Sequence, residues 1–142
     1  MHSGTMPPVN LLALLASTIA IFVLGGLWYS PLLFAKKWMA LQGKTPEQIA
    51  ASGGSVSAMM YVQALLCGLL TSAAMLVVTT HLPDRNAIHG AIMGVICWLG
   101  FAGATSYGTA LFSMKSKALW WIDSGYNLVC FVISGVILTA WQ

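Results

Sequence analysis

The sequence GGLWYSPLLFAKKW, from Gly25 to Trp38, ends a long apolar run and turns the chain at an aromatic and basic corner. Trp28 and Tyr29 suit a membrane–water boundary, because each has an apolar ring and a polar group that can reach water. Ser30-Pro31 is typical of a helix start, where the N–H that proline lacks is not needed. The corner therefore predicts a transmembrane helix followed by a short helix in the membrane interface.

The short helix is expected to run from Leu32 to Gln42 and to end at Gly43 in a left-handed cap. On a helical wheel the aromatic rings share one side and the lysines share the opposite side, which predicts rings in lipid and ammonium groups near anionic headgroups. An ordinary amphipathic linker is the alternative. The residues expected to anchor the chain at the interface are Trp28, Phe34, Lys36, Lys37, Trp38, Trp120 and Trp121.

The composition indicates an integral membrane protein. Hydrophobic residues make up 58% of the 142 residues, charged residues make up 6%, and the mean hydropathy is +0.84. Four apolar runs, at about 9–29, 57–80, 88–110 and 119–141, are each long enough to cross a hydrocarbon core of about 30 Å. We predict one all-α domain over residues 1–142, a membrane four-helix bundle with a short interfacial helix after the first span.

The basic residues predict the orientation of the chain. Lys36, Lys37 and Lys44 follow the first span, and Lys115 and Lys117 follow the third, whereas the other side carries only Arg85. By the positive-inside rule the lysine loops are cytoplasmic and both termini are external. Six basic residues in all are too few and too scattered for a nucleic-acid surface, so no nucleic-acid partner is expected.

Small residues recur every four positions on the second and third spans. Such stripes let helix backbones approach closely in lipid, and they can join helices of one chain or of neighbouring copies. Both possibilities are open. The residues expected to pack helices are Ala64, Gly68, Ser72, Gly90, Gly94, Gly100, Ala104 and Gly108.

Polar residues inside the spans give the functional hint. Asp123 and Asn127 lie on one face of the fourth span, and Gln63, Tyr29 and Tyr107 are expected at a similar depth. A carboxylate facing hydrocarbon is costly, so these residues could surround a polar pocket in the cytoplasmic third of the bundle. The alternative is that Asp123 caps the fourth helix and that Asn127 joins helices by hydrogen bonds.

The cysteines and histidines offer a weaker hint. Cys67, Cys97 and Cys130 form no Cys-x-x-Cys pair and are expected to act as small buried hydrophobes. His89, Met93 and Cys97 recur every four residues, which would suit a soft ion such as Cu(I). A single helix gives poor coordination geometry, however, so we predict no metal and no cofactor.

The corner from Gly25 to Met39 resembles that of a bacterial family of uncharacterised membrane proteins, domain of unknown function 1761. The resemblance extends to His89-Gly90, to Leu111-Phe112 and to the Ile122–Tyr126 segment. It implies a four-span protein of the bacterial inner membrane, and it implies no activity, ligand or catalytic residue.

The sequence favours two candidate functions. The first is a non-enzymatic membrane protein that associates with copies of itself or with a larger membrane complex, which the small-residue stripes favour. The alternative is a transporter or channel for a small molecule or ion, favoured by the polar cluster and by a faint repeat of Tyr29-x4-Phe34 at Tyr107-x4-Phe112. An enzyme is less expected, because no Ser-His-Asp set and no histidine-rich metal box is present in the sequence.

Overall fold

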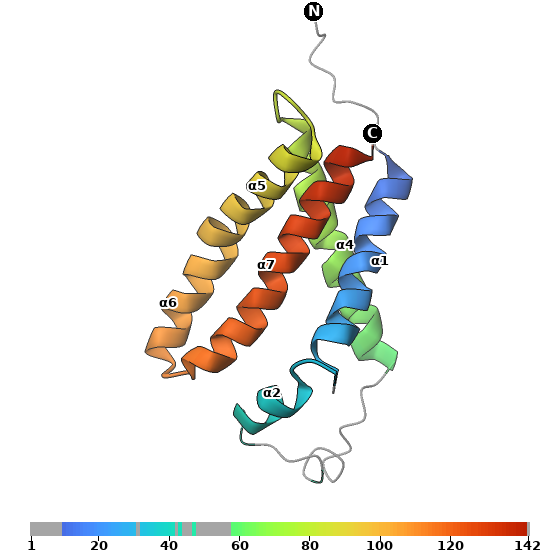
Figure 1. Cartoon of the computed structure of the whole chain (residues 1–142). Helices are drawn as coiled ribbons and strands as arrows, with labels where there is room; N and C mark the ends of the chain where they lie inside the picture. Colours follow the sequence, from blue (N-terminus) through green and yellow to red (C-terminus); the bar gives the residue numbers. More distant parts are fainter. Residues whose placement is uncertain (1–9, 31, 42, 44–46, 48–57, 142) are drawn as a thin grey trace, which may run out of the picture.

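A computed structural model describes residues 10–30, 32–41, 43, 47 and 58–141 of the chain. Over these residues it contains helices and no strand, which confirms the predicted all-α fold (Figure 1). A π-helical segment, η1, joins α5 and α6 into one long helix. The elements are α1 Leu11–Trp28, α2 Ala35–Leu41, α4 Ala58–Thr80, α5 Ala87–Cys97, η1 Trp98–Gly103, α6 Ala104–Phe112 and α7 Lys117–Ala140.

Four helices are long and apolar enough to cross a membrane. They cover Leu11–Trp28, Met59–Thr80, Ala87–Phe112 and Lys117–Ala140. Large apolar side chains such as Leu12, Ile19 and Leu70 are exposed on their outer faces, as contact with lipid requires. The chain is therefore a multi-pass membrane protein.

The helix ends follow from local chemistry. Asn86 caps α5 by accepting a 2.9 Å hydrogen bond from the backbone N–H of His89, and Gly43 has the expected left-handed backbone, with φ of 71°. Helix α2 begins at Ala35, three residues later than predicted. The reason is a turn at Ser30, whose carbonyl accepts the N–H groups of Leu33 and Ala35 at 3.0 and 3.1 Å.

The bundle is tightly packed at the end that holds the α4–α5 turn. The backbones of Gly90 on α5 and Gly135 on α7 touch, so that a Cβ on either glycine would overlap the other's carbonyl oxygen. Three buried hydroxyls then join three helices: Ser17 on α1 lies 2.7 Å from Ser72 on α4 and donates a 2.9 Å hydrogen bond to Ser134 on α7. Since Ser17 has one proton, Ser72 must donate to it. We call this the closed end.

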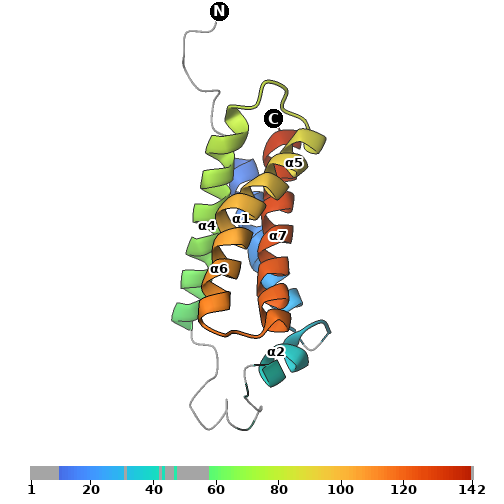
Figure 2. The ribbon, with the colours of Figure 1, turned by 90° about the vertical axis from the view of Figure 1, so that its left-hand side faces the viewer.

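The opposite end, which holds the loop between α6 and α7, is wide. Figure 2 shows α5 crossing α7 and α6 lying to its side. The indoles of Trp98 and Trp120 lie in the space between the helices, with ring centroids 6.4 Å apart. Each is held by a hydrogen bond of 2.9 Å, from Trp98 to the carbonyl of Ser124 and from Trp120 to the hydroxyl of Ser106. Glycines at one end and tryptophans at the other thus make a wedge between the two helices.

Candidate functional site

A polar cavity of about 550 Å³ occupies the wide end, between α6, α7 and the loop that joins them. All of its lining residues but one, Ala110, carry a polar atom in the side chain. They are Ser106, Thr109, Ala110, Ser113, Lys115, Trp120, Asp123, Ser124 and Asn127. A cavity with so many hydrogen-bonding groups inside a membrane protein is suited to water or a polar solute rather than to lipid tails.

Asp123 is the acidic group of this cavity, and it does not cap α7. The helix begins at Lys117, and its cap is Ser116, whose hydroxyl accepts from the N–H of Leu119 at 3.4 Å. The capping interpretation of Asp123 is therefore wrong. Its carboxylate instead accepts two hydrogen bonds on the same oxygen, Oδ1: one from the phenol of Tyr29 at 2.6 Å and one from the indole of Trp38 at 3.1 Å.

The aromatic corner packs against α7 and so positions this carboxylate. The ring of Tyr29 meets Trp38 edge-on, with centroids 5.4 Å apart, and Trp28 donates to the carbonyl of Ile122 at 2.9 Å. The structure corrects the placement of Trp38: its indole N–H faces Asp123 rather than lipid. The polar N–H of an indole finds a partner when it is half-buried, and the carboxylate is the partner here.

Of the other predicted anchors, two pack against the protein and three are exposed. Phe34 is half-buried, with its ring centroid 4.9 Å from that of Trp28, and Trp120 is buried beside the cavity. Lys36, Lys37 and Trp121 are exposed, so these three are free to meet an interface.

Among the predicted pocket residues, Asp123 and Asn127 line the cavity, and Tyr29 reaches Asp123 from the end of α1. Tyr107 packs edge-on against Trp120 at 4.9 Å and lines a second, smaller cavity of about 330 Å³. Gln63 is exposed on α4 and lines neither cavity. The part of α4 that carries Gln63 packs beside α1, where Tyr61 meets Phe22, so Gln63 is not part of the site.

Besides Ala110 and Trp120, five lining residues were not predicted for the pocket. A signal for three of them was present, because Ser106, Thr109 and Ser113 follow one another at steps of three and four and so share one face of a helix. Lys115 was read only as a topology signal. Ser124 was not considered, although it follows Asp123 directly.

Ser124 has an unusual hydroxyl. The residue is 2% exposed, and its Oγ makes no hydrogen bond to any residue that the structure describes. A serine inside a helix ordinarily bonds to a carbonyl one turn back, and a buried unpaired hydroxyl costs about 1–3 kcal/mol. The hydroxyl thus lacks a partner beside a polar cavity.

The small-residue stripes serve two different surfaces. Gly68, Ser72, Gly90 and Gly94 lie against other helices of the same chain, whereas Ala64 lines an apolar cavity between α1 and α4. Gly100 and Gly108 have nothing within 4 Å of the position of a Cβ, and Ala104 is exposed. The part of the stripe on η1 and α6 is therefore open to a second chain.

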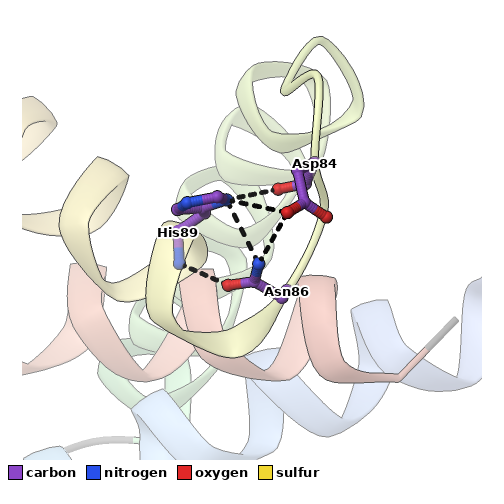
Figure 3. A network of polar contacts seen from close by, with 3 residues as sticks. All are labelled: Asp84, Asn86 and His89. Carbon is purple, nitrogen blue, oxygen red and sulfur yellow. Dashed lines mark hydrogen bonds and ion pairs between the residues drawn. The ribbon is translucent and has the colours of Figure 1, made fainter.

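The histidine and cysteine residues form no common site. His89 Nδ1 lies 2.7 Å from the carbonyl oxygen of Asp84 and 3.2 Å from the amide nitrogen of Asn86, within the turn that precedes α5 (Figure 3). Met93 packs on the apolar core that includes the buried Cys97. Cys130 is buried as well, whereas Cys67 is exposed on α4, which corrects the expectation that all three cysteines are buried. Within the described residues no three His, Cys, Asp or Glu side chains could hold a metal ion.

The fold and the cavity define a small four-helix membrane protein with a polar site at one end of the bundle. The chain matches the family described as "Protein of unknown function (DUF1761)" over residues 12–139, and it belongs to that family. No curated protein and no solved structure matches it.

Proposed function

We propose that the protein binds a small polar solute in the cavity between α6 and α7 and takes it up from the side of the lysine loops, as a small transporter or channel does. The observation that carries this proposal is the hydrogen bonding of the Asp123 carboxylate. Both donors to its carboxylate reach Oδ1, and no hydrogen bond from the described part of the chain reaches Oδ2. An ionisable group in a membrane span that keeps one oxygen free is a candidate for ligand contact.

The shape of the bundle supports uptake from one side. The closed end is filled by Met75, Leu138 and the hydrogen-bonded hydroxyls of Ser17, Ser72 and Ser134. The cavity lies at the other end, beside the loop that carries Lys115 and the start of α7 at Lys117. By the positive-inside rule we propose that this loop is cytoplasmic and that the termini are external, and we propose the plasma membrane of a bacterium as the location.

Association with further copies of the chain is the second candidate function. It is favoured by the stripe of Gly100, Ala104 and Gly108 on η1 and α6, where the first two residues are exposed and nothing lies within 4 Å of a Cβ at Gly108. If this stripe is an interface, Ala104→Leu separates the backbones and lowers the oligomer mass measured in mild detergent. An unchanged mass would remove this candidate.

Thiol labelling tests whether solutes reach the cavity. In a variant that lacks the three native cysteines, Asn127→Cys and Leu70→Cys place a thiol about 15–18 Å from the wide end of their helices, by rise per residue. Asn127 lines the cavity, whereas Leu70 is an exposed apolar residue on α4. A charged maleimide added to nanodiscs should react with the first thiol and not with the second. Equal labelling would refute a water-filled cavity.

Cavity filling tests whether the same space holds a solute. Thr109 lines the cavity and is exposed, so Thr109→Trp should fill it without disturbing the core. Native mass spectrometry of nanodiscs incubated with a deproteinised metabolite extract should find a retained small molecule on the parent protein and not on this variant. Retention by both would show that the solute binds elsewhere.

A further inference from the structure

We propose that the solute carries an ammonium group and an acidic group on one small skeleton, with the ammonium at Asp123 and the acidic group at Lys115. This inference rests on the proposed function and names the class of its ligand. It comes from two opposite charges that line the same cavity and that do not form an ion pair with each other.

The carboxylate is held in place for such a role. Tyr29 and Trp38 bind its Oδ1 from the corner between α1 and α2, which fixes the side chain and leaves Oδ2 available. An ammonium group donates three hydrogens and would satisfy that oxygen with a charge-assisted hydrogen bond. The indole of Trp120 lines the same cavity, and an aromatic ring attracts a cation that lies near it.

The backbone of the loop is fixed at Lys115, whose side chain is exposed. Its N–H donates to the carbonyl of Ala110 at 3.0 Å, and the preceding residue, Met114, has a left-handed backbone with φ of 56°. This tight turn places Lys115 in the walls of both cavities, whereas the neighbouring Lys117 lines only the smaller one.

A ligand with one charge would leave one of these groups unmatched. A simple cation would pair with Asp123 but meet the ammonium of Lys115, and a simple anion would meet the opposite problem. A zwitterion matches both charges, and the hydroxyls of Ser106 and Thr109, the free hydroxyl of Ser124 and the amide of Asn127 supply hydrogen bonds between them. The volume of about 550 Å³ is ample for a molecule of this size.

Two sources share this chemistry: a free amino acid, with ammonium and carboxylate, and a lipid headgroup with ammonium and phosphate. The test therefore begins with the protein in nanodiscs of phosphatidylcholine, which has no N–H donor. The twenty amino acids are offered as a mixture, and retained species are identified by mass spectrometry. The nanodiscs are then rebuilt with phosphatidylethanolamine, and retention of that lipid through gentle activation is measured.

Matched probes and variants test the charge pairing. A retained amino acid should bind about tenfold or more tightly than its amide, which lacks the acidic charge, and than its 2-hydroxy acid, which lacks the ammonium. If the headgroup is the ligand, phosphatidylethanolamine should be retained and its methylated analogue should not. Lys115→Gln should lower retention of either ligand about tenfold, and the control Lys117→Gln should not.

Asp123→Asn tests the role of the negative charge while keeping the hydrogen bonds that position the side chain. Asparagine keeps an oxygen that can accept from Tyr29 and Trp38, so the variant should fold with unchanged thermal stability while losing the ligand. The proposal is overturned if the amide binds as well as the amino acid, if Lys117→Gln weakens binding as much as Lys115→Gln does, or if neither zwitterion is retained. In each of these cases labelling of Asn127→Cys and retention of another solute would still support the proposed function.

Discussion

The close approach of α5 and α7 makes a sharp prediction at Gly94. A Cβ added there would lie 2.5 Å from the carbonyl oxygen of Phe131, 2.8 Å from its carbon and 2.9 Å from Cα of Val132. All three are backbone atoms of α7 and cannot rotate away. Since carbon and oxygen atoms ordinarily stay about 3.3 Å or more apart, Gly94→Ala must move the helices apart by about 0.8 Å.

Gly108→Ala is the matched control, because nothing lies within 4 Å of a Cβ at that position on α6. Replacing glycine by alanine inside a helix gains about 1 kcal/mol of helix propensity, and both variants share this gain. Overpacking a tight contact costs about 1–3 kcal/mol. The free energies of unfolding of the two variants should therefore differ by about 1–3 kcal/mol, with Gly94→Ala the less stable.

The native cysteines supply the assay. Cys97 and Cys130 are buried and become reactive only when the bundle opens, whereas the exposed Cys67 is replaced by alanine to remove background. Reaction with a fluorogenic maleimide, measured against increasing SDS in mixed micelles, reports the unfolding free energy. Equal stability of Gly94→Ala and Gly108→Ala would show that α5 and α7 do not touch as described.

Three further predictions follow from the corner, the closed end and the loops. Trp38→Phe keeps the ring but loses the hydrogen bond to Asp123, so unfolding in SDS should show a loss of about 0.5–1.5 kcal/mol; no loss would contradict the bond. Ser17→Ala removes both hydroxyl contacts at the closed end, and the same titration should show about 1–2 kcal/mol of destabilisation, since each such bond contributes about 0.6–1.7 kcal/mol. In intact cells an impermeant maleimide should label Asp84→Cys from outside and should leave Ser116→Cys unlabelled. The reverse pattern would contradict the predicted topology.

The helices were predictable because each span is long, apolar and bounded by polar turns. Hydropathy depends only on residues that are neighbours in the chain, and so does the left-handed backbone of Gly43. The corner was recognised as an aromatic turn for the same reason. The contact of the corner with α7 was not predictable, because the partner of Tyr29 and Trp38 is Asp123, which lies 94 and 85 residues away.

The cavity could be predicted only in part. The polar face of α7 pointed to Asp123 and Asn127, since helical periodicity is a local property. The distance of the α5–α6 helix from α7 depends instead on which residues meet there: one glycine pair at one end and the indoles of Trp98 and Trp120 at the other. A sequence shows that these residues exist but not that they face the same helix, so the residues that α6 and the loop contribute were missed.

The two ends of the wedge between α5–α6 and α7 also differ in how much substitution they tolerate. At the glycine end any added atom collides with backbone, so this end tolerates almost no change and holds the fold. At the tryptophan end Thr109 and Asn127 are exposed and line the cavity, so their replacement leaves the glycine contact in place. Wall residues of the cavity can therefore be exchanged while the glycine contact that sets the distance between the helices stays as it is.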